Sequence, residues 1–211
     1  MTKANIKILI DRLNEVYPNS GCSLNFKNEW QLLVATILSA QCTDERVNKV
    51  TEKLFDKYKT ISDFANANLL DFEQDIYSTG FYKNKAKNIL ATANIVHDEY
   101  EDVLPRTIDE LIKLPGVGRK TANVVRGNIF NEQAIVVDTH VKRISNRLGL
   151  TKSLDPVKAE YELMKVLPEE TWTKYNHQII DHGRAICTSQ KPKCEICHLR
   201  DICKHGKSLK I

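Results

Sequence analysis

The segment 114–121, which reads Leu-Pro-Gly-Val-Gly-Arg-Lys-Thr, constrains the fold most because it ends one helix and begins another. Upstream of it, Thr107 and Glu110 have the spacing of a capping box, which predicts a short helix over 108–114. The Pro-Gly pair should end that helix, and a second helical pattern opens at Gly118. The sequence therefore predicts a helical hairpin in the middle of the chain.

Two glycines separated by one residue form the turn of this hairpin. Gly116 and Gly118 let backbone N–H groups come close to an outside anion, and the positive end of the second helix points the same way. A DNA phosphate suits such a turn. The same turn places Lys120 near the helix start, where the helix dipole disfavours an ammonium. A lysine that is neutral part of the time is a nucleophile.

Helical periodicity recurs along almost the whole chain, whereas a strand signal is confined to residues 134–137. We therefore expect an all-α fold. Three aspartates, Asp44, Asp138 and Asp155, are placed to cap predicted helices, and Gly149 should end the helix that Asp138 caps. The most apolar stretch, residues 30–40, is too short to span a membrane and has the pattern of a buried helix. The first residues lead into an amphipathic helix and lack the apolar core of a signal peptide. We expect a cytoplasmic protein without membrane contact.

Basic residues are unevenly distributed, although the net charge is only +4. Residues 184–211 contain seven Lys or Arg and two acidic residues, which suits either a solvated face or contact with DNA. A second basic cluster, formed by Lys83, Lys85 and Lys87, opens another predicted helix at the end where the dipole disfavours cations. For these three lysines the sequence leaves open a solvated face and contact with backbone phosphates.

Four of the six cysteines crowd into residues 187–203 with the spacing C-x6-C-x2-C-x5-C, while Cys22 and Cys42 stand alone. This crowding in a chain without a secretory signal favours metal ligation over a disulfide framework. Zinc sites commonly use two close cysteine pairs, whereas this run has a single close pair. An iron-sulfur cluster is the other candidate for four thiolates.

Three motifs together resemble the endonuclease III family of DNA glycosylases. Residues 114–122 are similar to its helix-hairpin-helix, residues 137–141 around Asp138 to its aspartate motif, and the four spaced cysteines to its iron-sulfur loop. The resemblance implies an all-α helix-hairpin-helix DNA glycosylase fold with two helical domains and a DNA-binding cleft between them. The expected domains are residues 22–132, with the hairpin at about 107–130, and residues 1–21 plus 133–211.

The resemblance also implies the reaction: a bifunctional DNA glycosylase and apurinic/apyrimidinic lyase of base excision repair that acts on oxidised pyrimidines. The amine of Lys120 would attack the sugar, expel the base and form a Schiff base before β-elimination. Asp138 would accept the lysine proton or stabilise positive charge on the sugar ring. A carboxylate that caps a helix stays charged, which favours the electrostatic role over the general-base role. The sequence does not decide the relative weight of the two roles.

The resemblance implies double-stranded DNA with damaged bases or abasic sites as the partner and a [4Fe-4S] cluster as the cofactor. It also implies that the protein is a monomer. Gln41 would enter the space left by an extruded base, and Phe81 would press between bases. Without the resemblance, a surface amide between two helices explains Gln41 as well as DNA insertion does, and Phe81 could be a core residue. The implied DNA-binding set is Gln41, Phe81, Gly116, Gly118, Arg119, Lys191 and Lys193, and the implied cluster ligands are Cys187, Cys194, Cys197 and Cys203.

Two other classes of function compete with this one. A monofunctional relative, such as an adenine or mismatch glycosylase, would have another residue in place of Lys120, so this lysine disfavours that class. A noncatalytic DNA-binding or electron-transfer module would share the cysteines and the basic tail. Only the bifunctional enzyme predicts a covalent adduct with an abasic site that depends on Lys120.

Overall fold

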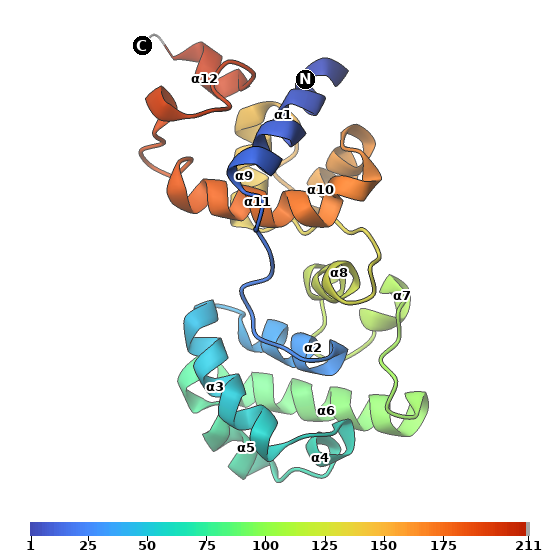
Figure 1. Cartoon of the computed structure of the whole chain (residues 1–211). Coiled ribbons are helices and arrows are strands. Elements are labelled where there is room, and N and C mark those ends of the chain that lie inside the picture. The colour runs from blue at the N-terminus through green and yellow to red at the C-terminus, as the bar shows by residue number, and fades with distance from the viewer. Residues whose placement is uncertain (210–211) are drawn as a thin grey trace. The chain divides into compact units, whose positions relative to one another are not determined.

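The computed structural model describes residues 1–209, and every regular element within them is a helix (Figure 1). The predicted all-α class is therefore confirmed. The chain forms two compact units. One unit, Cys22–Glu132, contains the hairpin and is called the hairpin unit below; the other joins Met1–Gly21 to Gln133–Ile211 and is called the cysteine unit.

The hairpin unit is built around one buried helix. Every side chain of this helix, α2, from Trp30 to Leu38 is buried, and α3, α6 and α8 pack against it. Each fully buried leucine contributes about 2 kcal/mol of transfer free energy, so α2 is a firm anchor for the loop that follows it. The elements of this unit are α2 (Glu29–Leu38), α3 (Asp44–Lys57), α4 (Ile61–Ala65), α5 (Leu69–Asp75), η1 (Tyr77–Thr79), α6 (Tyr82–Tyr100), α7 (Ile108–Leu111) and α8 (Arg119–Asn128).

Several predicted helix ends need correction in this unit. The buried helix predicted over 30–40 ends at Leu38, and Ala40 is exposed in the following turn. The first hairpin helix, α7, ends at Leu111 rather than at residue 114, because the chain tightens into a turn ahead of Pro115. Its capping box is half formed. The Thr107 side chain accepts from the Glu110 N–H, but the Glu110 carboxylate accepts from the Thr107 hydroxyl instead of from its backbone.

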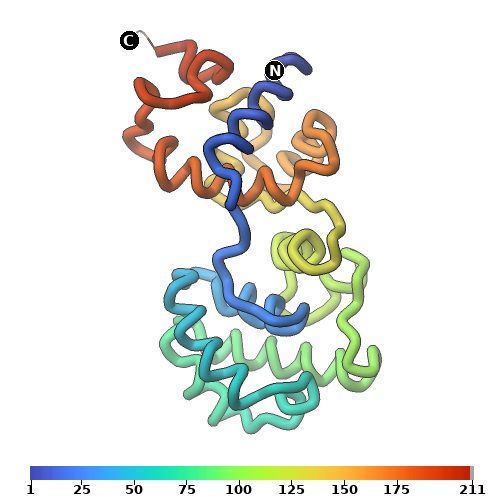
Figure 2. The backbone as a smooth tube through the Cα atoms, viewed as in Figure 1, coloured from blue at the N-terminus to red at the C-terminus, as the bar shows by residue number. Residues whose placement is uncertain are grey.

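The cysteine unit has its own hydrophobic core, to which α1, α9, α10 and α11 contribute. Figure 2 shows the N-terminal helix, in blue, lying beside α11, in orange, although the two are far apart in sequence. The β-like segment 134–137 has no regular secondary structure and forms no strand within the described chain. The elements are α1 (Lys3–Val16), α9 (Thr139–Leu148), α10 (Pro156–Val166), η2 (Glu169–Thr171), α11 (Trp172–Ala185), η3 (Cys194–Ile196) and α12 (Lys204–Ser208).

Capping residues set the beginnings of the helices that carry the candidate site. Asp138 caps α9 and Gly149, in the left-handed region, ends it, as the sequence predicted. Asp155 with a following proline likewise starts α10. The predicted cap Asp44 is wrong by one residue, because the Thr43 side chain accepts the hydrogen bond from the backbone of Arg46. Within residues 1–209, none of the helices combines the length and apolar character that crossing a bilayer requires.

Candidate active site and cysteine cavity

Lys120 lies in the first turn of α8, and its side chain is exposed. The N-cap of this helix is Gly118, which has extended backbone and supplies no side-chain acceptor. The first N–H groups of a helix have no partner within the helix. The start of α8 therefore offers N–H donors and the positive end of the helix dipole to an acceptor from outside, next to an exposed amine.

The two hairpin glycines have different structural roles. Gly116 has a φ of 75°, and a Cβ placed on it would lie 2.8 Å from the Cβ of Asn88 on α6. Gly118 would meet nothing within 4 Å. The hairpin is further fixed to α6 by the hydroxyl of Thr92, which donates to the carbonyl of Pro115 at 2.8 Å. Gly116 is thus needed by the fold, whereas the free space at Gly118 leaves room for a molecule approaching from outside.

Asp138 is half-buried at the start of α9 in the cysteine unit. One carboxylate oxygen accepts from the N–H of Val141 at 2.7 Å. Burial lowers the pKa of the nearby His140; the charge of Asp138 raises it, and that of Arg143 lowers it. The Arg143 guanidinium lies 3.2 Å from Nδ1 of His140 and also donates to the carbonyl of Cys187 at 3.0 Å.

Gln41 and Phe81 occupy the tips of two loops of the hairpin unit. Both side chains are exposed, that of Phe81 by 65%, so Phe81 is not a core residue. Both residues also have left-handed backbone, with φ of 56° at Gln41 and 49° at Phe81. Such a conformation is uncommon outside glycine and is unfavourable for a bulky aromatic residue. Strained residues of this kind concentrate at functional sites.

Lys85, four residues after Phe81, does not fit either interpretation of the basic cluster. Its side chain is buried, and its ammonium donates to the carbonyls of Leu38 at 2.8 Å and Thr79 at 2.9 Å. Burial lowers the pKa of this amine. Lys85 is therefore neither solvated nor directed at DNA phosphates, while Lys83 and Lys87 are exposed.

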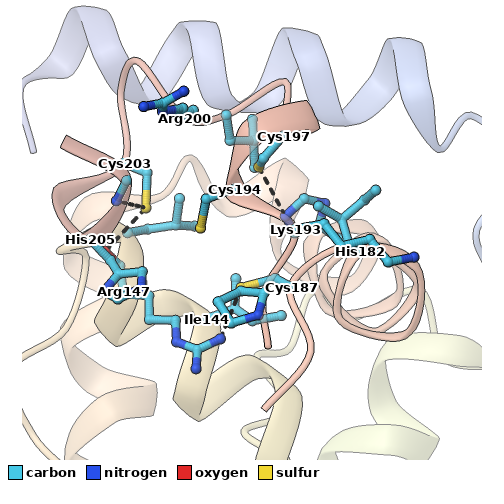
Figure 3. A pocket seen from close by; sticks show the side chains of 15 residues that line it. Ile144, Arg147, His182, Cys187, Lys193, Cys194, Cys197, Arg200, Cys203 and His205 are labelled. Atoms are coloured by element: carbon cyan, nitrogen blue, oxygen red, sulfur yellow. Dashed lines mark hydrogen bonds between the residues drawn. The ribbon is translucent and has the colours of Figure 1, made fainter. Parts of the chain in front are cut away.

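The four clustered cysteines border one cavity in the cysteine unit (Figure 3). Cys187 follows α11, Cys194 begins the 3-10 turn η3 and Cys197 follows it, and Cys203 caps α12. All four are free thiols. Within residues 1–209, no three His, Cys, Asp or Glu side chains converge as ligands of a single metal ion. The thiols instead surround a shared space, and four thiolates are the ligand set of an iron-sulfur cluster.

Lys191 and Lys193 lie between the first two of these cysteines, and both side chains are exposed. The ammonium of Lys193 donates to the carbonyl of Ala185, the last residue of α11, at 3.2 Å. A cation at a helix C-terminus is favourably placed with respect to the dipole. The carbonyl of Lys191 accepts from the hydroxyl of Thr188 at 2.7 Å, which fixes the backbone of this loop.

Comparison with known proteins agrees with the fold and the motifs. Residues 34–169 match the HhH-GPD superfamily of base excision DNA repair proteins. Endonuclease III of Synechocystis sp. is 50% identical over 197 residues, which cover 93% of this chain and 90% of the relative. Endonuclease III of Bacillus subtilis is 45% identical over 203 residues, covering 96% and 93% of the two chains. The chain belongs to the endonuclease III family.

A solved structure of another endonuclease III is similar over 98% of both chains, with 46% identity and a TM-score of 0.91. That structure holds a trapped covalent intermediate of endonuclease III with DNA. The likeness confirms the predicted helix-hairpin-helix glycosylase fold.

Two residues of this endonuclease III family member that sequence reasoning missed lie at the cysteine cavity. Arg147 donates to the carbonyls of Thr188 and Ser189, each at 2.7 Å, and to Sγ of Cys187 at 3.3 Å. His182 is buried, with Nε2 3.7 Å from Sγ of Cys197. For Arg147, helical spacing was a signal in the sequence. Arg143 and Arg147 are one turn apart, so they lie on the same face of the helix that Asp138 caps.

Proposed function

We propose that this protein is a bifunctional DNA glycosylase and apurinic/apyrimidinic lyase of base excision repair, with Lys120 as the nucleophile. The observation that carries the proposal is the start of α8, where an exposed lysine stands beside N–H donors that no side chain caps. The trapped covalent complex with DNA of a protein 46% identical to this chain supports a covalent mechanism. Double-stranded DNA is accordingly the partner.

The reaction needs a neutral amine at the sugar. The lone pair of the Lys120 Nζ attacks C1′ of the deoxyribose, and the bond to the damaged base breaks with its electron pair leaving on the base. Loss of the amine proton and ring opening give a Schiff base between Nζ and C1′. Removal of a proton from C2′ then expels the 3′ phosphate by β-elimination, and water releases the enzyme.

Asp138 is the second catalytic residue in this proposal. Positive charge develops on the sugar as the base departs, and a fixed carboxylate stabilises it. The hydrogen bond from the backbone of Val141 holds one oxygen of that carboxylate in place. The same group can accept the proton that the lysine loses, since both roles require an ionised carboxylate.

DNA binding has two parts in the proposal. The start of α8, with Gly116, Gly118 and Arg119, takes a backbone phosphate through N–H groups and positive charge. Lys191 and Lys193, in the cysteine unit, are proposed to contact backbone phosphates as well. Gln41 and Phe81 act on the bases: the glutamine fills the space left by the extruded nucleotide, and the exposed phenylalanine enters the stack beside it. Oxidised pyrimidines are the proposed substrates.

We further propose that Cys187, Cys194, Cys197 and Cys203 hold a [4Fe-4S] cluster. The fit rests on the cavity that all four thiols border, and on the single 3-10 turn that sets two of them on its wall. When bound, such a cluster supplies a rigid cross-link and a redox centre. The loop between Cys187 and Cys194 also carries Lys191. Residues that fix this loop therefore also fix the lysine that we propose contacts DNA.

The six free cysteines suit a reducing compartment, so we place the enzyme in the cytoplasm. The two division points of the chain, near residues 21 and 132, are proposed as the boundaries of the two functional domains.

Borohydride trapping on a duplex with one abasic site tests the function. The wild type should give a covalent adduct, and Lys120→Ala should give none. Lys158→Ala is the matched control, because Lys158 is also an exposed lysine in the first turn of a helix, α10, and should trap like the wild type. An adduct that persists in Lys120→Ala, or a wild type that forms none, contradicts the proposal.

A further inference from the structure

Lys85 connects two segments of the hairpin unit that are far apart in sequence. Its side chain is 5% exposed, although it lies in the first turn of α6. The ammonium donates to the carbonyl of Leu38 at 2.8 Å and to that of Thr79 at 2.9 Å. One buried cation thus holds two backbone oxygens in a fixed relation.

Both carbonyls belong to the last residues of helices. Leu38 ends α2 and Thr79 ends η1. The last carbonyls of a helix lack partners within it, and a cation there also complements the helix dipole. The ammonium of Lys85 therefore caps two helix C-termini at once.

Each of these helix ends leads directly into one of the two exposed loop tips. Gln41 follows Leu38 by three positions, and Phe81 follows Thr79 by two. Both tips have left-handed backbone, with φ of 56° and 49°. Lys85 also reaches the second tip through its backbone, since its N–H donates to the carbonyl of Phe81 at 3.2 Å.

A lysine is a costly way to fill this space. Burying an ammonium carries a large desolvation penalty, and burial indeed lowers the pKa of Lys85. An apolar side chain of the same length would fill the same volume without that penalty. What the ammonium adds is the hydrogen-bonded connection between the two carbonyls.

We propose that Lys85 is a positioning residue that couples the two tips, so that Gln41 and Phe81 enter the DNA as one unit. This inference rests on the proposed function, in which those side chains occupy the stack around the extruded nucleotide. Extrusion leaves a gap whose two edges lie at a fixed spacing. Two tips held at a fixed spacing fill it together, and the entropy of ordering them separately is avoided.

The experiment compares two substrates for Lys85→Met, which keeps the length of the stem and removes the donors. The first is a duplex with an oxidised pyrimidine, in which a gap must be filled. The second is a single-stranded oligonucleotide with an abasic site, in which there is none. Single-turnover excision from the duplex should fall roughly tenfold or more, because two buried carbonyls lose their charged donor. Borohydride trapping on the single strand should stay at the wild-type rate.

Lys59→Met makes the same chemical change at an exposed lysine of the same unit and should match the wild type on both substrates. Lys85→Gln has amide donors but no charge and should show an intermediate loss on the duplex. It replaces Lys85→Met if thermal melting shows that the methionine variant does not fold.

A double-mutant cycle separates positioning from a general structural role. In a background that carries Gln41→Ala and Phe81→Ala, adding Lys85→Met should cost little further activity on the duplex, because the tips it positions are gone. Additive losses, equal losses on both substrates, or full duplex activity in Lys85→Met would each overturn the inference. A wild type that forms no borohydride adduct on a duplex with an abasic site would instead refute the proposed function.

Discussion

Asp138 accepts a hydrogen bond from the backbone N–H of Val141 at 2.7 Å. One carboxylate therefore caps α9 and, in the mechanism proposed above, faces the sugar. A cap needs only an acceptor oxygen, whereas stabilising a cationic sugar needs a full negative charge. The two roles can be separated because asparagine fulfils the first and not the second.

Asp138→Asn should keep the stability of the wild type and lose activity. Asparagine and aspartate are comparable N-caps, so the free energy of unfolding should change by less than about 0.5 kcal/mol. Single-turnover excision should fall by about 100-fold or more, the usual contribution of a charged group in the transition state. Asp138→Ala is the control for the cap and should also cost about 1 kcal/mol of stability. An active Asp138→Asn enzyme would show that the charge is not needed.

The two hairpin glycines should respond differently to alanine. Gly116→Ala forces a Cβ to within 2.8 Å of Asn88 at a φ of 75°, so it should destabilise the protein by about 2 kcal/mol. Gly118→Ala meets nothing within 4 Å and should cost no more than about 1 kcal/mol, the price of a poorer N-cap.

Among variants that remain folded, Gly118→Ala should lose more DNA affinity than Gly116→Ala, although it should lose less stability. The new methyl group of Gly118→Ala would stand where the phosphate approaches, so its dissociation constant for abasic duplex should rise, as measured by fluorescence anisotropy at fixed salt. Equal affinities for Gly118→Ala and the wild type would place the phosphate elsewhere.

Arg147→Met should weaken the cysteine loop. Its guanidinium donates to the carbonyls of Thr188 and Ser189 at 2.7 Å, next to Cys187, the first of the proposed cluster ligands. Without those bonds the loop is less well ordered, so purified protein should contain less iron and sulfide per chain and lose its visible absorbance sooner in air. Arg46→Met, at an exposed position of α3, is the control and should keep the wild-type iron content.

Zinc in place of iron, in a colourless wild type that remains folded and active, would refute the cluster itself. Unchanged iron content in Arg147→Met would show instead that the ligands hold the loop without help from this arginine.

Local signals made much of the fold predictable. Asp138 and Gly149 bound α9 because a short acceptor side chain and a left-handed glycine end helices wherever they occur. The errors arose where neighbours compete. Thr43 displaces Asp44 as the cap of α3, and the turn before Pro115 shortens α7. Which of two neighbouring residues caps a helix, and where the helix ends, depends on packing against residues outside the local segment.

The candidate site was predictable only where its residues carry their own signature. The glycines and Lys120 form a contiguous motif, and the cysteines have a distinctive spacing. Lys85 and Arg147 have no such signature, because what defines them is contact with carbonyls far away in sequence. Because Lys85 lies between Lys83 and Lys87 in the sequence, its burial becomes apparent only in the folded structure.

Glu162 should make stability depend on pH in the acidic range. Its carboxylate accepts from the N–H groups of Lys152 and Ser153, which lowers its pKa from the ordinary 4.5. A lowered pKa means that the unfolded chain binds the proton more readily, so the stabilisation is present above 4.5 and is lost as pH falls through the folded value.

Glu162→Gln keeps an acceptor oxygen but removes the titration. Urea unfolding at a series of pH values should therefore show the wild type more stable than Glu162→Gln at neutral pH, with the difference vanishing in acid. A difference that is constant across this range would mean that the charge of Glu162 does not contribute.

Gly183→Ala should disturb the packing between α11 and α9. A Cβ at this position would overlap Nδ1 of His140 and lie 2.9 Å from Cδ1 of Ile144, both on α9. Because Ile144 is buried in the core of the cysteine unit, the strain should cost about 1–3 kcal/mol in the free energy of unfolding. Gly21→Ala, which meets nothing within 4 Å, should melt like the wild type. Because Asp138 caps α9, the folded fraction of Gly183→Ala should also excise more slowly. Full activity in that fraction would show that α9 can move without displacing its cap.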